Sequence, residues 1–188
     1  MNLPGEDEIR ALHRRFAPDD EAFELVWTHC RIVRDLAEQL RTTEDPDLVR
    51  AGALLHDIGV HRLAPGESYI RHGLLGRELL RGLGLPESLA RVCAHHTGVG
   101  LTRDDIVAQN LPLPPADYLA ETPEETLVMY ADKFHSKTTP PRFNTPSAYA
   151  ASLVRFGPGK VAIFEDLVAR YGPPELNDLA ERYGHAVH

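Results

Sequence analysis

The sequence predicts an all-α protein, a single-domain helical bundle, and three observations support this fold class. Apolar residues recur at spacings of three and four over most of the 188 residues, which is the period of amphipathic helices. Proline, glycine and capping residues separate these segments where helices begin and end. The sequence contains no alternating run of useful length, no internal repeat and no low-complexity segment. Because the length suits one domain of ordinary size, we expect residues 1–188 to form a single domain.

Four helices are predicted in the first half of the chain, and each has a boundary signal. They cover residues 6–16, about 19–41, about 46–59 and 69–83. Pro18 stops the first helix, Asp19 or Asp20 caps the second, and Gly59 stops the third. Ser68 opens the fourth, after a loop of glycine, proline and charged residues. The third helix is apolar on nearly every side, so we expect it to be buried.

The second half of the chain also predicts helices. Pro86 starts one that ends near residue 98, Thr102 caps a short one, and Thr122 with Glu125 at the capping-box position starts another. The last three helices cover residues 148–156, 159–171 and 174–183, separated by Gly-Pro pairs. The segment 138–147 is rich in proline and threonine; we interpret it as a connection, with a lid over a site as the alternative.

Composition and charge exclude several classes of function. The net charge of −8 argues against binding a nucleic-acid polymer through bulk electrostatics, although a small anionic substrate remains compatible with it. No apolar run is long enough to span a membrane and the N-terminus does not resemble a signal peptide, so we expect a cytoplasmic protein. Cys30 and Cys93 lie inside predicted helices, which suits reduced, buried thiols; a disulfide between them is the alternative.

Histidines and aspartates occupy inward positions on five predicted helices, where apolar residues are expected. They are His29, His56, Asp57, His72, His96 and Asp132. Each one alone could be a core residue satisfied by a hydrogen bond or a cap. Together they lack a comparable number of inward lysines and arginines, and an unpaired buried carboxylate is costly. A metal centre inside a helical bundle removes this difficulty, and imidazole with carboxylate ligands favours iron, manganese, cobalt or zinc.

The order of these residues resembles the HD-domain superfamily of metal-dependent phosphohydrolases, whose pattern is H…HD…D. Here the pattern reads His29, His56-Asp57 and Asp132, and residues 56–59 match the HDIG variant. The resemblance implies an HD core over about residues 19–137, with C-terminal helices at about 145–184 packed on or beside it. Residues 96–98, HisThrGly, are similar to those of small bacterial members that cleave dinucleoside polyphosphates and of archaeal relatives.

The resemblance also implies a dinuclear metal centre with two divalent cations per chain. In this interpretation His29, His56, Asp57 and Asp132 hold one metal. Asp57 bridges to a second metal, which His72 and His96 hold, and it is therefore also a catalytic residue. His96 is favoured over its neighbour His95 because it lies on the apolar stripe of its helix.

The charged residues that would act on a phosphoryl group are less firmly indicated. The lysine that often follows HDIG in the family is absent here, where the sequence continues Val60-His61-Arg62. Arg62 and Lys133 are the expected catalytic cations, because each closely follows a ligand, whereas Lys137 and Arg142 are less favoured. The candidates for a general acid, or for residues behind the ligands, are His61, His95 and His135. An ordinary structural role is the alternative for each of these side chains.

The function implied by the resemblance is hydrolysis of a phosphate ester or anhydride by a metal-activated hydroxide. The expected partner is a small phosphorylated substrate, a nucleotide or a related molecule. Two alternatives belong to other classes: a mixed-valent di-iron oxygenase that cleaves a C–P or C–C bond, and a non-catalytic module that senses nucleotides. The C-terminal helices could either make a homodimer contact or simply close the bundle.

Overall fold

The structure, a computed structural model, describes residues 3–188, and helices make up nearly all of its regular structure. The α-helices are α1 (Glu6–Phe16), α2 (Asp20–Leu40), α3 (Pro46–Leu55), α4 (His72–Gly82), α5 (Glu87–His95), α6 (Arg103–Ala108), α7 (Pro123–Asp132), α8 (Pro146–Leu153), α9 (Pro158–Tyr171) and α10 (Asn177–Tyr183). Three short 3-10 helices are η1 (Ile58–Arg62), η2 (Tyr69–Arg71) and η3 (Val154–Phe156). The all-α prediction is confirmed.

Side-chain caps explain where several helices begin; those at Asp19 and Thr122 were predicted, and that at Asp45 was not. The Asp19 carboxylate accepts a hydrogen bond from the backbone N–H of Ala22 at 2.8 Å, at the start of α2. The Asp45 carboxylate caps α3 in the same way, and the Thr122 hydroxyl accepts from the N–H of Glu125 at the start of α7. The boundaries of α1 agree with the prediction at both ends.

The third helix is shorter than predicted, and this changes the setting of the His-Asp pair. It ends at Leu55, and Asp57 has φ −104° and ψ 8°, outside the helical range, before η1 begins at Ile58. Gly59 is therefore not a helix stop but a point of close contact between η1 and α4. A Cβ atom there would lie 2.0 Å from the carbonyl oxygen of His72, so only glycine fits.

Other differences from the prediction lie at element ends. The helix expected over residues 69–83 begins as the 3-10 turn η2, and α4 proper starts at His72. The last helix, α10, starts at Asn177, three residues later than expected. The C-terminal end of the helix predicted for 148–156 is the 3-10 helix η3.

A small sheet was missed by the prediction. The strands are β1 (His135–Ser136), β2 (Arg142–Phe143) and β3 (Ala186–Val187), each of two residues. Strand β2 pairs antiparallel with β1 and parallel with β3, so the C-terminus returns to the segment that follows α7. Two-residue strands are too short to show an alternating pattern, and their pairing depends on contacts distant in sequence.

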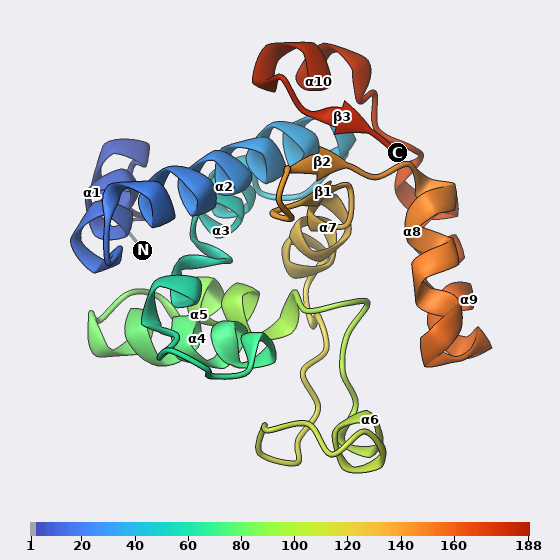
Figure 1. Cartoon of the computed structure of the whole chain (residues 1–188), viewed down its shortest axis with the longest axis horizontal. Helices are drawn as coiled ribbons and strands as arrows, with labels where there is room; N and C mark the ends of the chain where they lie inside the picture. The colour runs from blue at the N-terminus through green and yellow to red at the C-terminus, as the bar shows by residue number, and fades with distance from the viewer. Residues whose placement is uncertain (1–2) are drawn as a thin grey trace.

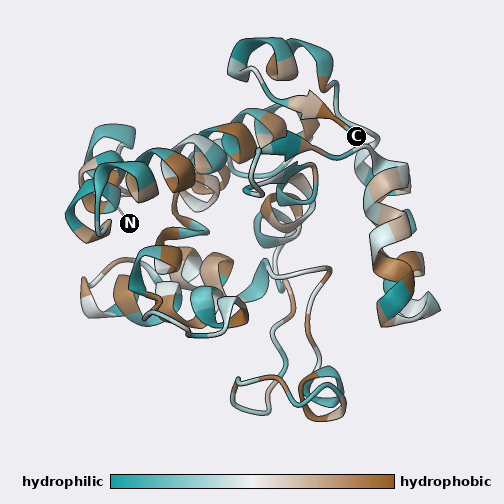
Figure 2. Cartoon of the chain, viewed as in Figure 1, coloured by the Kyte–Doolittle hydropathy of each residue, from teal (hydrophilic) through white to brown (hydrophobic). Residues whose placement is uncertain are grey.

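Two layers of helices surround the inward-facing polar residues. Helix α2 packs against α3 and α7, whereas α4 pairs with α5 and contacts η1, and α3 links the layers through α5. Figure 1 shows α2 across the top of the core, the α4–α5 pair below, and α8 with α9 to one side. Figure 2 shows apolar and hydrophilic residues interspersed along the helices, as amphipathic packing requires.

Two further properties concern the cysteines and the membrane prediction. Cys30 and Cys93 are free and buried, as predicted for reduced thiols. Among the residues that the structure describes, no helix combines the length and apolar character needed to cross a bilayer.

Candidate metal centre

All of the predicted ligands converge on one place in the interior. They come from the middle of α2 (His29), the turn after α3 (His56 and Asp57), the start of α4 (His72), the residue after α5 (His96) and the last residue of α7 (Asp132). These residues form three overlapping groups, and in each group the potential ligand atoms lie within 4.8 Å of one another. Helix ends place most of these side chains, because a residue at the end of an element can turn into the space between layers.

The two carboxylate oxygens of Asp57 face different sets of donors. Its Oδ2 lies 3.3 Å from Nε2 of His29 and 3.6 Å from Nε2 of His56. Oδ1 of Asp132 completes this set, at 3.0 Å from Nε2 of His29 and 3.4 Å from Nε2 of His56. Two imidazoles and two carboxylates therefore surround one position.

The other oxygen of Asp57 faces a second pair of histidines. Oδ1 lies 3.2 Å from Nε2 of His72 and 3.4 Å from Nε2 of His96, and these two nitrogens are 2.9 Å apart. Oδ1 is buried and has no hydrogen-bond partner among the described residues. A buried carboxylate oxygen without a donor is costly, so this position is suited to a cation.

Backbone carbonyls fix the tautomers of three of the histidines. Nδ1–H of His56 donates to the carbonyl of Ala53 at 2.7 Å, that of His72 to Tyr69 at 2.6 Å, and that of His96 to Cys93 at 2.7 Å. In a neutral imidazole this leaves the lone pair on Nε2, and each Nε2 points into the centre. Such an arrangement is typical of histidines that bind metals.

The fourth histidine, His29, is oriented by a chain of histidines instead of a carbonyl. Nδ1 of His29 lies 2.8 Å from Nδ1 of His135, and Nε2 of His135 lies 2.9 Å from Nδ1 of His185. In the tautomer that leaves the lone pair of His29 on Nε2, facing the centre, Nδ1–H of His29 donates to His135 and Nε2–H of His135 donates to His185. No local pattern could predict His185, because the pairing of the adjacent strand β3 brings it here from 50 residues away.

Burial and neighbouring charges set the protonation of the centre. Burial lowers the pKa of His72 to about 4, lowers that of His29 to about 4, and also lowers that of His96. These imidazoles are therefore neutral near pH 7, as metal ligands must be. Burial also disfavours charge on His56, but Asp57 beside it outweighs this effect and raises its pKa well above 6.5.

Both aspartates are ionised because lysines lie beside them. Burial alone would raise the pKa of Asp57, but Lys137 and His56 lower it well below 3.8. Asp132 behaves in the same way, with Lys133 as the strongest influence. Nζ of Lys137 donates to Oδ2 of Asp57, so an ammonium group stands where a cation would neutralise this carboxylate. The imidazole and carboxylate groups therefore fit a metal ion. Lys133 and Lys137 balance part of the negative charge of the two aspartates.

The two lysines differ in how firmly they are held. Nζ of Lys133 donates to Oδ2 of Asp132 at 2.7 Å and to the carbonyl of His96 at 2.8 Å, and the residue is 5% exposed. Lys137 contacts Asp57 and lies over the ring of Tyr69, 5.9 Å from its centroid. Lys133 was expected in the site; Lys137, which the prediction favoured less, is there as well.

The structure places several of the other candidates outside the centre. Arg62 is exposed and borders a separate hollow beside Phe16, so the prediction that it faces the site is wrong. His61 lies 3.1 Å from His13, away from the centre, and Arg142 is exposed on β2. The η1 helix turns the chain away immediately after the His-Asp pair, which separates Arg62 from the ligands.

His95 lies behind the ligands, whereas His135 both contacts His29 and borders the cavity that the ligands face. Nδ1 of His95 lies 2.9 Å from the buried carboxylate of Glu125, which also accepts a hydrogen bond from Arg91. Glu125 belongs to α7, which ends at Asp132, and His95 belongs to α5, which ends just before His96. The contact therefore joins the two helices that position these ligands.

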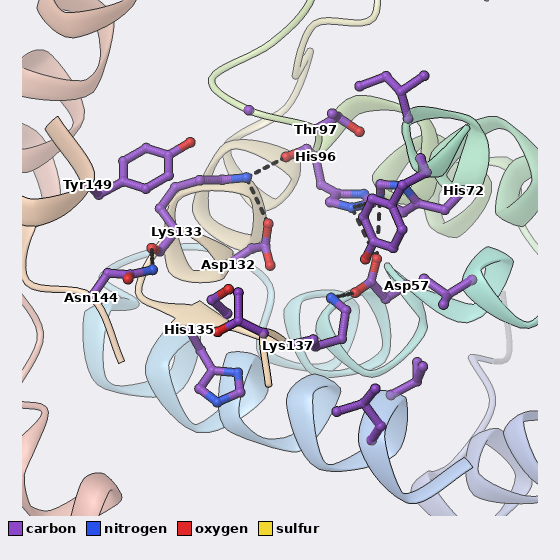
Figure 3. Close-up of a pocket in the computed structure, with 18 residues that line it drawn as sticks. Asp57, His72, His96, Thr97, Asp132, Lys133, His135, Lys137, Asn144 and Tyr149 are labelled. Atoms are coloured by element: carbon purple, nitrogen blue, oxygen red, sulfur yellow. Dashed lines mark hydrogen bonds and ion pairs between the residues drawn. The ribbon is translucent and has the colours of Figure 1, made fainter. Parts of the chain in front are cut away.

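The centre opens into a cavity of about 480 Å³, a size typical of small-molecule sites. Figure 3 shows Asp57, His72 and His96 on one side of it, and Asp132 and Lys133 on the other. The wall also includes Tyr69, Asn144 and Tyr149, which were not predicted as site residues. They come from η2, from the loop before α8 and from α8, and no spacing pattern connects them to the ligands.

Comparison with known proteins places this arrangement in a wider context. The model of the HD domain family matches residues 26–137. An uncharacterised protein of Methanocaldococcus jannaschii is 41% identical over 116 residues, which cover 58% of this chain and 65% of that protein. A tRNA (cytidine(56)-2′-O)-methyltransferase of Picrophilus torridus is 34% identical over 134 residues, covering 71% of this chain. The chain spans less than two thirds of both relatives, 65% and 37% of their lengths.

Solved structures show the same fold. The HD domain of the L. monocytogenes phosphodiesterase PgpH, in complex with cyclic-di-AMP, has a TM-score of 0.54 at 17% sequence identity. That match covers 96% of this chain and 99% of the other. A second structure of the same domain has a TM-score of 0.52 at 15% identity.

Proposed function

Because this chain belongs to the HD-domain family, we propose that it is a metal-dependent phosphohydrolase that cleaves a phosphate ester or anhydride of a small molecule. One observation supports this most strongly: the two oxygens of Asp57 face two separate donor sets, and Oδ1 has no hydrogen-bond partner among the described residues. A bridging carboxylate between two cations fits that geometry.

In this proposal the first cation is held by His29, His56, Asp57 and Asp132, and the second by Asp57, His72 and His96. When bound, such divalent cations lower the pKa of water and neutralise phosphoryl oxygens. The protein contributes orientation: backbone carbonyls and His135 hold each imidazole with Nε2 inward, so that little rearrangement is needed on binding.

The lysines have distinct roles in the proposed reaction. Lys133 uses two of its three N–H groups on Asp132 and His96, which leaves one for a phosphoryl oxygen in the cavity. Lys137 is paired with Asp57 and borders the cavity, so its ammonium group would be able to turn toward a phosphoryl oxygen when the charge of Asp57 is shared with a bound cation. Charge that develops on the phosphoryl group is then balanced by groups already in place.

The histidine pair tests the two-metal proposal. We expect the purified protein to hydrolyse a chromogenic phosphoester with Mn²⁺, and His72→Ala or His96→Ala to bind one metal per chain instead of two. Elemental analysis and turnover on the same preparations measure both effects. His61→Ala is the matched control, because it removes an imidazole that contacts His13 instead of Asp57. Two metals per chain in His72→Ala would contradict the second site.

The proposed role of Lys137 predicts opposite changes in metal affinity and turnover. In Lys137→Met the ammonium no longer competes for Asp57, so we expect Mn²⁺ to bind about tenfold more tightly. Turnover should nevertheless fall about 100-fold, because a group that balances charge on the phosphoryl group is lost. Metal titration and kcat measure the two effects separately. Lys137→Arg keeps the charge and should recover much of the turnover; wild-type kcat in Lys137→Met would exclude the role.

A further inference from the structure

A second hollow lies beside the metal cavity, and the two share part of their walls. It has a volume of about 400 Å³. Ile70, Thr97, Gly98 and Tyr149 line both spaces. Thr97 and Tyr149 are visible in Figure 3 near Lys133, at the edge of the metal cavity. A molecule bound through its phosphate at the metals could therefore extend directly into this hollow.

The chemistry of the second hollow differs from that of the first. Its wall is largely apolar, with Val99, Leu101, Leu111, Leu153 and Phe156. Leu153 and Val99 are buried, whereas Phe156 is 45% exposed. An exposed phenylalanine at the rim of an apolar hollow gains contact area when a ligand covers it.

Two polar side chains of the hollow, Lys160 and Ser152, already have partners within the protein. Nζ of Lys160 donates to Oδ2 of Asp105 at 2.6 Å and to the carbonyl of Gly100 at 2.7 Å. The hydroxyl of Ser152 donates to the carbonyl of Tyr149 at 2.6 Å. The lysine of this wall is therefore already paired, and in the proposed function the metal cavity would supply the anion site.

Flat groups line one side of the hollow. The guanidinium of Arg155 lies over the ring of Phe156, 4.6 Å from its centroid, and both residues contribute to the wall. The ring of Tyr149 is held by packing against Phe164, with centroids 4.8 Å apart. Aromatic and guanidinium planes are surfaces on which bases stack.

From these observations, and resting on the proposed phosphohydrolase function, we propose that this hollow binds a planar aromatic group, a nucleobase, attached to the phosphate that the metals hold. The substrate class is then a nucleotide or nucleotide ester rather than a sugar phosphate or an inorganic phosphate. Specificity would come from the wall that η3, α8 and the 97–101 segment form together.

The test compares two ligands that differ only in the base. The 5′-phosphonate analogues of AMP and of ribose 5-phosphate, whose P–C bonds resist hydrolysis, are titrated calorimetrically into the metal-loaded full chain. We expect the base-bearing ligand to bind at least about tenfold more tightly, since stacking of one base has an effect of this size or larger. Equal affinity for the two ligands in the wild-type protein would overturn the proposal.

Substitutions in the wall of the second hollow test whether the preference for the base-bearing ligand arises there. Ser152→Trp fills the hollow from an exposed position and should remove the preference for the base, and Phe156→Ala should reduce it several-fold. Val154→Ala is the matched control, because Val154 lies on the same short helix, is 67% exposed and does not line the hollow. An unchanged preference in Ser152→Trp, with native circular dichroism, would also overturn the proposal.

The same preparations separate this inference from the function on which it rests. Failure of the wild-type protein to turn over a chromogenic phosphoester with Mn²⁺ would count against the phosphohydrolase. The ratio of the two phosphonate affinities does not depend on turnover, so it reports on the hollow alone.

Discussion

Asp57→Asn is expected to abolish metal binding at both positions and to lower phosphoester turnover about a thousandfold or more. Asn has nearly the shape of Asp but lacks the negative charge that two cations would share. Because Asp57 faces both donor sets, no other residue among the six should remove both metals when it is changed. Elemental analysis and kcat on the same sample measure the two effects.

The same substitution has a second consequence, for stability. The side chain of Lys137, which is 15% exposed, would keep its charge after losing its partner, and this should cost up to about 3 kcal/mol, the lower end of the range for fully buried pairs. Loss of turnover could then reflect unfolding, so the double variant Asp57→Asn, Lys137→Met is the control. It removes both charges and should regain much of the stability, while it still binds no metal. Two metals retained in Asp57→Asn would contradict the bridging role.

The site residues that could be predicted from the sequence are polar side chains at positions where a helix normally has an apolar residue. Asp57 and Asp132 are carboxylates among apolar neighbours, and His29 lies at the centre of an apolar stripe. Such residues are conspicuous because burial penalises them unless a partner exists. Each helix buries its apolar face, so polar residues on those faces meet in the interior. Their proximity could therefore be predicted without knowing the conformations of the loops. Their binding of metals stays a prediction.

Two residues of the site, Lys137, which the prediction favoured less, and His185, which it missed, are placed by contacts that no local sequence pattern reveals. Lys137 lies on the chain just beyond β1, and its position over Asp57 depends on where the chain leaves α7. His185 reaches His135 only because β3 pairs with β2, a contact between segments about 45 residues apart in the chain. The expectation for Arg62 shows the converse. Arg62 is close to the ligands in the sequence, but η1 directs its side chain away from them.

Gly59→Ala is expected to be the most destabilising single-methyl change in the fold. The added Cβ would lie 2.0 Å from the carbonyl oxygen of His72 and 2.3 Å from the backbone nitrogen of Gly76. Both are backbone atoms, which cannot rotate aside, so η1 and α4 must separate. We expect a loss of more than about 3 kcal/mol in the free energy of unfolding, measured by urea denaturation.

The glycine also couples the fold to the centre. Because η1 follows Asp57 directly and α4 begins at His72, moving the two elements apart should pull His72 away from Oδ1 of Asp57. Any folded Gly59→Ala protein should therefore bind the second metal more weakly than the first. Gly82→Ala is the matched control: it adds the same methyl group near the end of α4, where nothing lies within 4 Å, and should be neutral or slightly stabilising. If Gly59→Ala unfolded at the same urea concentration as wild type, the close approach of η1 and α4 would not constrain the site.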